Sequence, residues 1–218
     1  MTAFWTDPES AVGWAQQDAQ QALLALPRAI AAEIVAADRP QTAVVADIGS
    51  GPGDFLAVFL QRLPGARGLW SDISQTMETL GRERLATFGG RVDYRIADMT
   101  DFSGLPEDLD VIVTSRAVHH LDRDGLHAFY RDAGRHLAPR GWLINLDHFG
   151  PNDVWDARLR AARKILVPRT GEQRPHHHNY PLTSVADHVH AFIEAGFTDV
   201  ETPWRGFVTG LFMARRDG

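Results

Sequence analysis

The sequence predicts a single α/β domain built on a doubly wound, seven-stranded β-sheet that is mostly parallel, with a C-terminal antiparallel hairpin strand and an N-terminal helical cap. Strand-like and helix-like patterns alternate from about residue 42 to 149, a rhythm typical of a parallel sheet with helices on both faces. A glycine-rich turn follows the first strand pattern. The last two strand patterns are separated by only a few residues, which suits an antiparallel hairpin and is too short for a crossover helix.

The N-terminal segment, residues 1–41, is expected to form the helical cap. Residues 10–37 are rich in Ala, Gln and Leu, and we expect Pro27 to break them into two helices. Short apolar runs with β-branched residues then predict strands at 42–48, 66–72, 92–98, 109–115 and 141–149. Helical patterns lie between them at 55–63, 75–88 and 122–138, and Asp54 is placed to cap the first of these.

The pattern changes after the predicted alternating core at residues 42–149. Helices are predicted at 153–167 and 184–196, on either side of an irregular segment. Two strand patterns, 198–204 and 207–215, form the predicted hairpin. The last helix and this hairpin are the predicted final part of the chain, residues 183–218. No linker rich in Pro, Gly or Ser divides the chain, so we expect one domain over residues 1–218.

Charge and composition narrow the classes of function. The formal net charge is −6, which disfavours sequence-independent binding of nucleic-acid phosphates. The chain has no cysteine, so it has no disulfides, thiolate zinc sites or thiol nucleophiles, and a cytoplasmic location is expected. The N-terminus has neither a basic segment nor an apolar stretch, and no apolar run approaches the ~18 residues that span a bilayer. We therefore expect neither a signal peptide nor a membrane partner.

The turn after the first predicted strand, within the stretch VVADIGSGPGDF, is the first candidate binding site. In a doubly wound sheet ligands bind beyond the carboxyl ends of the strands, and Gly49, Gly51 and Gly53 allow close approach to the backbone. The spacing is not that of a dinucleotide loop, because Asp54 stands where G-x-G-x-x-G needs its third glycine, and no lysine follows as in a phosphate loop. The negative charges of Asp47 and Asp54 favour a zwitterionic or cationic ligand over a pyrophosphate.

The stretch ADIGSGPGDF resembles the first motif of the class I S-adenosylmethionine-dependent methyltransferases, whose cofactor carries a sulfonium, an ammonium and a carboxylate group. Further stretches fall in the order of that family: VDYRIADM, DVIVTSRAVHHL, LAPRGWLINLD and FIEAGFTDVE. The resemblance runs from about residue 44 to 215. It implies this fold and S-adenosylmethionine as cofactor, and it says little about the substrate.

The resemblance also implies which residues bind the cofactor. Asp72 takes the place of the acid that binds both ribose hydroxyls, Asp98 that of the acid that meets the adenine amine, and Met99 covers the ring. Ser115 would line the methionine part. The implied set is Asp47, Gly49, Ser50, Gly51, Gly53, Asp72, Ile73, Asp98, Met99 and Ser115. From the residues alone, Asp72 could instead cap the next helix, and Asp98 could be a turn residue.

Three histidines are candidate catalytic bases. Methyl transfer from a sulfonium requires an aligned nucleophile, exclusion of water and, for a protonated acceptor, removal of a proton. His119 and His120 follow the fourth predicted strand and His148 ends the fifth, with His119 preferred because it lies closer to the strand end. The alternatives are a structural role for one of the pair and a surface position for His148. Arg116 is a candidate for binding a carboxylate of cofactor or substrate, or else a solvated arginine.

Residues 150–182 lie where the family builds its substrate lid, so the resemblance implies contacts between them and the substrate. Within RPHHHNYPL, His178 and Tyr180 are the candidate substrate contacts. Successive side chains of an extended segment point in opposite directions, so His176 to His178 are not expected to form a metal site by themselves. An iron or zinc site that combines one or two of them with side chains of the cleft is the alternative, and we expect no metal.

The predicted function is methyl transfer from S-adenosylmethionine to a small molecule, at oxygen or nitrogen. The acidic charge, and the absence of the N-P-P-[YF] signature where TSRAVHH stands, argue against nucleic-acid acceptors. One alternative is a non-methylating reaction with the same fold and cofactor, such as a cyclisation or decarboxylation. The others are a nicotinamide-nucleotide oxidoreductase and a non-catalytic binding protein. The sequence names neither the acceptor nor the oligomeric state.

Overall fold

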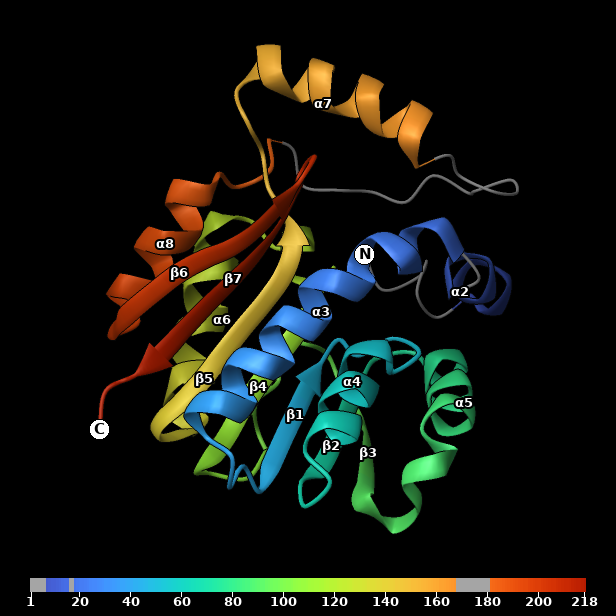
Figure 1. Ribbon diagram of the computed structural model, residues 1–218, viewed down its shortest axis with the longest axis vertical. Coiled ribbons are helices and arrows are strands. Elements are labelled where there is room, and N and C mark those ends of the chain that lie inside the picture. Colours follow the sequence, from blue (N-terminus) through green and yellow to red (C-terminus); the bar gives the residue numbers. More distant parts are fainter. Residues whose placement is uncertain (1–6, 16–17, 168–180) are drawn as a thin grey trace.

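A computed structural model describes residues 7–15, 18–167 and 181–218 of the chain. The described residues form a seven-stranded sheet with the order β3-β2-β1-β4-β5-β7-β6 (Figure 1). The strands are β1 Val44–Ile48, β2 Arg67–Asp72, β3 Val92–Ile96, β4 Leu109–Ser115, β5 Leu137–His148, β6 Phe197–Gly206 and β7 Thr209–Arg216. Strands β1 to β5 pair in parallel. β7 runs antiparallel to both β5 and β6, so the predicted mostly parallel sheet with a hairpin strand is confirmed.

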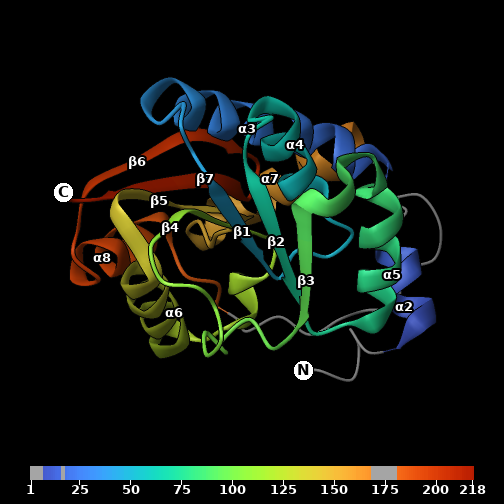
Figure 2. The same cartoon turned by 90° about the horizontal axis from the view of Figure 1, so that it is seen from below.

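Helices cover both faces of this sheet (Figure 2). Helices α3 (Asp18–Asp38), α4 (Asp54–Arg62) and α5 (Gln75–Arg84) lie on one face, and α6 (Arg123–His136) and α8 (Val185–Glu194) lie on the other. Alternate strand residues supply the two cores: Val111 and Val113 of β4 pack toward α3 and α4, whereas Ile112 packs toward α6. Helix α2 (Pro8–Ala15) lies against α5, and α7 (Asp153–Leu166) lies beyond the carboxyl end of β5.

Two predictions about helix ends are wrong. Pro27 does not break the N-terminal helix, because α3 runs through it. Burial of Leu24, Ala31 and other residues along α3 outweighs the lost backbone hydrogen bond, which costs roughly 3 kcal/mol in a helix interior. Asp54 does not cap α4 either. Gly53 occupies the cap position in a left-handed conformation, and Asp54 is the first helical residue.

The helix predicted for residues 122–138 ends earlier, at His136, and β5 begins at Leu137. Ala138 precedes Pro139, and the residue before a proline disfavours helical geometry, which explains the early change to extended chain. The pairing of β4 with β5 shifts in register between Leu109 and Val111, and this irregularity accommodates the proline near the start of β5.

A buried carboxylate fixes the start of the sheet at the amino end of β1. Asp110 of β4 is 8% exposed and accepts hydrogen bonds from the backbone amides of Ala43 and Val44, at 2.6 and 3.0 Å. Its other oxygen accepts from Nε of Arg39 at 2.9 Å, next to the end of α3. Asp110 therefore holds three segments together at the edge opposite the candidate site.

Candidate active site

The described site residues predicted from the sequence lie along the carboxyl edge of the sheet. Asp47 to Gly53 follow or end β1, Asp72 and Ile73 end β2, Asp98 and Met99 follow β3, Ser115 to His120 end or follow β4, and His148 ends β5. β1 and β4 are neighbours, and the strand order reverses between them, so this edge is the topological switch point of the sheet. His178 and Tyr180 lie outside the described residues.

The glycine loop after β1 uses backbone conformations that favour glycine. Gly49, Gly51 and Gly53 have positive φ values of 67°, 56° and 84°. A Cβ atom placed on Gly49 would lie 2.7 Å from Cβ of Ala117, so the loop packs directly against the segment that follows β4. The three glycines are therefore required by the path of the chain; their contact with a ligand stays a prediction.

Asp72 at the end of β2 ties the loop to the neighbouring strand. One carboxylate oxygen accepts a hydrogen bond from the amide of Gly51 at 2.8 Å, and the other accepts from the amide of Ser74 at 2.9 Å. Burial raises the pKa of this carboxyl group, and hydrogen bonds from the backbone amides of Ser74, Gly51 and Ile73 oppose the shift. Ser74, not Asp72, is the cap of α5. A carboxylate has about four acceptor positions, so Asp72 keeps the capacity to accept from a hydroxyl donor.

Asp47 lies inside the loop. It is 1% exposed and accepts hydrogen bonds from Oγ of Ser50 at 2.7 Å and from the amide of Leu56 at 3.2 Å. Burial raises the pKa of Asp47 to about 7. The carboxyl group thus joins the end of β1, the glycine turn and the first turn of α4.

The residues after β3 have a different setting. Asp98 is exposed, and one of its oxygens accepts hydrogen bonds from the amide and hydroxyl of Thr100, at 2.9 and 2.7 Å. This is the turn geometry that the residue type alone allowed. Met99 is half-buried against the core beneath α6.

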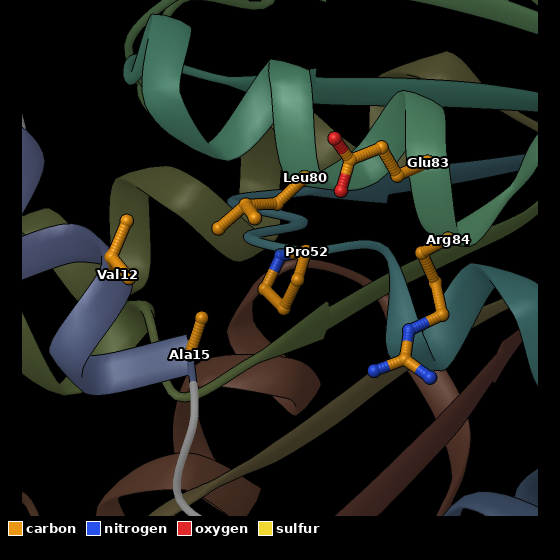
Figure 3. Close-up of a pocket in the computed structure, with 6 residues that line it drawn as sticks. All are labelled: Val12, Ala15, Pro52, Leu80, Glu83 and Arg84. Atoms are coloured by element: carbon orange, nitrogen blue, oxygen red, sulfur yellow. The ribbon is translucent and has the colours of Figure 1, made fainter.

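A pocket with a volume of about 400 Å³ lies beside the glycine loop (Figure 3). Its lining combines apolar side chains of α2 and α5, a proline of the loop and two charged side chains at the end of α5: Val12, Ala15, Pro52, Leu80, Glu83 and Arg84. Helix α2 therefore contributes a wall to the space around the loop.

A buried histidine–aspartate pair joins the ends of β4 and β5. His119 lies in the short 3₁₀ helix Val118–His120, and its Nδ1 is 2.6 Å from Oδ1 of Asp147. The backbone amide of His119 donates to Oδ2 of the same carboxylate at 2.9 Å. Although burial of Asp147 favours its neutral form, His119 and His148 hold the pKa of the carboxyl group below its usual range. An ionised Asp147 can only accept a hydrogen bond, so Nδ1 of His119 carries the proton and donates, which leaves Nε2 as the atom that can act as a base.

The other two candidate bases surround this pair. The ring centroids of His120 and His148 lie 4.1 and 4.9 Å from that of His119. Nδ1 of His148 is 3.1 Å from the hydroxyl oxygen of Thr209 on β7. Burial and the neighbouring His119 lower the pKa of His148 well below its ordinary value, so it is neutral at physiological pH. His148 is half-buried.

Arg116 is buried rather than solvated, being 6% exposed. Its backbone has a positive φ of 52°, and its amide donates to the carbonyl oxygen of Leu146 at 3.1 Å. Burial and the charge of Arg28 lower the pKa of Arg116 to about 9. Sequence reasoning missed Arg28 and Arg163 near this position. The only signal for Arg28 was a charged residue within an otherwise apolar helical stretch.

Within the described ranges, no three His, Asp or Glu side chains are arranged to hold a metal ion. None of the helices in those ranges is both long and apolar enough to cross a membrane. The triplet at His176 to His178 lies outside the described residues.

The order and directions of the strands, with the glycine loop at the switch point, are those of the fold of class I S-adenosylmethionine-dependent methyltransferases. The loop provides a bare backbone and Asp72 provides acceptors for hydroxyl groups, so both fit the cofactor of that class, S-adenosylmethionine. Residues 45–141 match the family model described as a methyltransferase domain, which agrees with the resemblance found in the sequence.

Individual proteins show the same likeness. The chain is 39% identical over 75 residues to trans-aconitate 2-methyltransferase of Mycolicibacterium gilvum, which covers 34% of this chain and 27% of the relative. It is 30% identical over 105 residues to a ubiquinone/menaquinone biosynthesis C-methyltransferase of Cereibacter sphaeroides, covering 46% and 40%. The chain therefore spans less than half the length of these relatives. The apo structure of the S-adenosylmethionine-dependent methyltransferase SibL covers 91% of this chain and 57% of its own, with a TM-score of 0.67 and 21% identity, and so shares the fold.

Proposed function

We propose that this chain transfers the methyl group of S-adenosylmethionine to an oxygen or nitrogen atom of a small molecule, with His119 as the base. The observation that carries the proposal is the contact between His119 and Asp147. Ala117, two residues before His119, packs against Gly49 of the glycine loop. The candidate base and the glycine loop therefore lie at the same edge of the sheet. The two relatives whose names include methyltransferase support the reaction type.

The residues have separate tasks in this proposal. S-adenosylmethionine supplies a methyl group on a leaving group that is already activated. Asp72 and the loop amides hold the cofactor, and burial of the histidine cluster keeps water from the reacting atoms. Nε2 of His119 removes the proton of the acceptor, while Asp147 orients the ring and stabilises its charged form. A positioned base contributes typically ~10²–10⁴-fold in rate.

The test is a transfer assay with S-adenosylmethionine labelled on its methyl group. A panel of alcohols, phenols, amines and carboxylic acids, including trans-aconitate, is screened for labelled product and for S-adenosylhomocysteine. We expect His119→Ala to lower turnover of the active acceptor at least ~10²-fold while the affinity for S-adenosylhomocysteine is unchanged. His190→Ala is the matched control, because that side chain is 58% exposed on α8.

Three results would contradict the proposal. Conversion of a substrate with S-adenosylmethionine left unchanged would show a non-methylating reaction. Thermal stabilisation by NAD but not by S-adenosylhomocysteine would show a nicotinamide enzyme. Normal turnover of His119→Ala would place the base elsewhere or show that the acceptor arrives deprotonated.

A further inference from the structure

Helix α7 presents apolar side chains to solvent. Seven large apolar side chains are exposed in the described part of the chain, and four of them belong to α7: Val154, Trp155, Ile165 and Leu166. None of the other described helices and strands packs extensively against α7, which lies beyond the sheet at one end of the molecule (Figure 1). Exposed apolar side chains that gather on one element are typical of a surface that binds a partner.

Part of this surface is a continuous stripe along the helix. Residues three or four positions apart lie on the same side of an α-helix. Four exposed residues follow this spacing and form the stripe: Val154, Ala157, Ala161 and Ile165. Leu159 and Arg163, which are half-buried, lie on the opposite side of the helix. The two alanines in the middle of the stripe are small, so another helix can approach closely there.

Charged side chains of opposite sign flank the two ends of the stripe. Asp153 begins α7, and Lys164 lies in its last turn. About three turns separate these two residues, so they lie on the same flank of the stripe, and both are exposed. Neither has an ion-pair partner among the described residues, whereas Asp156 pairs with Arg160 within the helix at 2.6 Å. The flank is therefore acidic at one end and basic at the other.

We propose that α7 binds α7 of a second copy of this chain in an antiparallel pair, which makes the protein a weak homodimer. In a twofold arrangement, each end of one stripe meets the opposite end of the other. Val154 of one copy then packs against Ile165 of the other, and Asp153 of one copy faces Lys164 of the other. Symmetry forms each of these contacts twice, so the stripe is complementary to itself in both apolar surface and charge.

The mixed charge of the flank favours a second copy over an anionic lipid surface. Lipid headgroups would repel Asp153, whereas Lys164 of a second copy attracts it. The contact is short, because the 14 residues of α7 span about 21 Å. A pair of such helices lies at the low end of specific interfaces, so we expect an equilibrium between monomer and dimer at micromolar to millimolar concentrations. The inference does not depend on the proposed function.

The test uses two charge variants, Asp153→Lys and Lys164→Asp. In a homodimer of either variant, like charges face each other at both ends. Self-association measured by analytical ultracentrifugation should therefore weaken at least ~10-fold relative to the wild type. In an equimolar mixture, the lysines of one variant face the aspartates of the other. A fluorescently labelled trace of one variant should therefore associate with the other within about 3-fold of the wild-type affinity.

An uncharged variant gives an independent measurement if either charge variant loses helix in circular dichroism. Ile165→Ser removes the apolar side chain at one end of the stripe, which is 78% exposed in the monomer, and should weaken self-association at least ~10-fold. Ile193→Ser is the matched control, because Ile193 is 57% exposed on α8 and lies outside the stripe. This control should associate as the wild type does.

The proposal is overturned if the wild type stays monomeric at millimolar concentration. It is also overturned if the two charge variants do not associate with each other while the wild type associates with itself, or if Ile165→Ser and Ile193→Ser associate equally. Cosedimentation of monomeric wild type with phosphatidylserine vesicles would assign the stripe to a lipid surface instead.

Discussion

Replacing Asp47 with Asn should make the stability of the ligand-free protein less dependent on pH. The carboxyl group is 1% exposed, and burial raises its pKa from 3.8 to about 7. Between these two values the folded protein keeps a proton that the unfolded chain releases. The folded state therefore binds more protons, and stability falls as the pH rises toward 7.

The size of the effect follows from the pKa difference. Each pKa unit corresponds to about 1.4 kcal/mol, so the wild type should lose on the order of 2–4 kcal/mol between pH 4 and 8 through this group. Asparagine keeps an oxygen that can accept the hydrogen bonds of Ser50 and Leu56, and it has no charge to bury. Asp47→Asn should therefore be more stable than the wild type at pH 8 and lose this advantage at pH 4.

The assay is urea unfolding of both proteins at several pH values, with Asp93→Asn as control because Asp93 is exposed on β3. The measured quantity is the difference between variant and wild type. Other groups contribute to both: burial lowers the pKa of His188 to about 4, which makes stability rise over part of the same range. A parallel pH dependence of the two proteins would show that Asp47 is ionised in the folded state, and would refute the reasoning.

Three further outcomes are expected. Gly51→Val should abolish S-adenosylhomocysteine binding in calorimetry while circular dichroism still shows the folded sheet, because a branched residue is strained at φ 56°. Normal binding would show that the loop is only a turn and does not hold the cofactor. Asp110→Ala should lower the free energy of unfolding by roughly 2–4 kcal/mol in urea, because two backbone amides and Arg39 lose their acceptor; a loss within ~0.5 kcal/mol would mean that water replaces it. Asp147→Asn should reduce turnover at least ~10²-fold with unchanged S-adenosylhomocysteine affinity, because the ring of His119 loses its orienting carboxylate; unchanged turnover would make the pair structural.

The elements of the sheet could be predicted because each strand has its own local signal. Apolar runs with β-branched residues mark strands buried on both faces, and the intervening helices have amphipathic patterns. Local sequence signals gave wrong predictions where contacts between distant segments determine the structure. Pro27 lies inside a helix that the core stabilises, and Asp54 gives way to Gly53 as the cap because the loop arrives in a left-handed conformation.

The candidate site likewise contains residues that the local sequence could predict and residues that it could not. The glycine loop and Asp72 are each next to a strand end in the sequence, so the pattern could place them. The contact between His119 and Asp147 joins residues 28 positions apart and depends on β4 and β5 being neighbours. Arg28 and Arg163 come from helices far apart in the sequence, and no local pattern shows that folding brings them near Arg116.

Calorimetric titration of S-adenosylhomocysteine into the wild type and Asp72→Ala tests the central claim most directly. Asp72 is held by the amides of Gly51 and Ser74, and it offers a charged acceptor for two ribose hydroxyls. The account predicts that the wild type binds and that Asp72→Ala loses about 2–3 kcal/mol, or roughly thirty- to a hundred-fold in affinity, whereas the exposed control Asp93→Ala binds normally. A wild type that does not bind, or a folded Asp72→Ala variant with unchanged affinity, would contradict it.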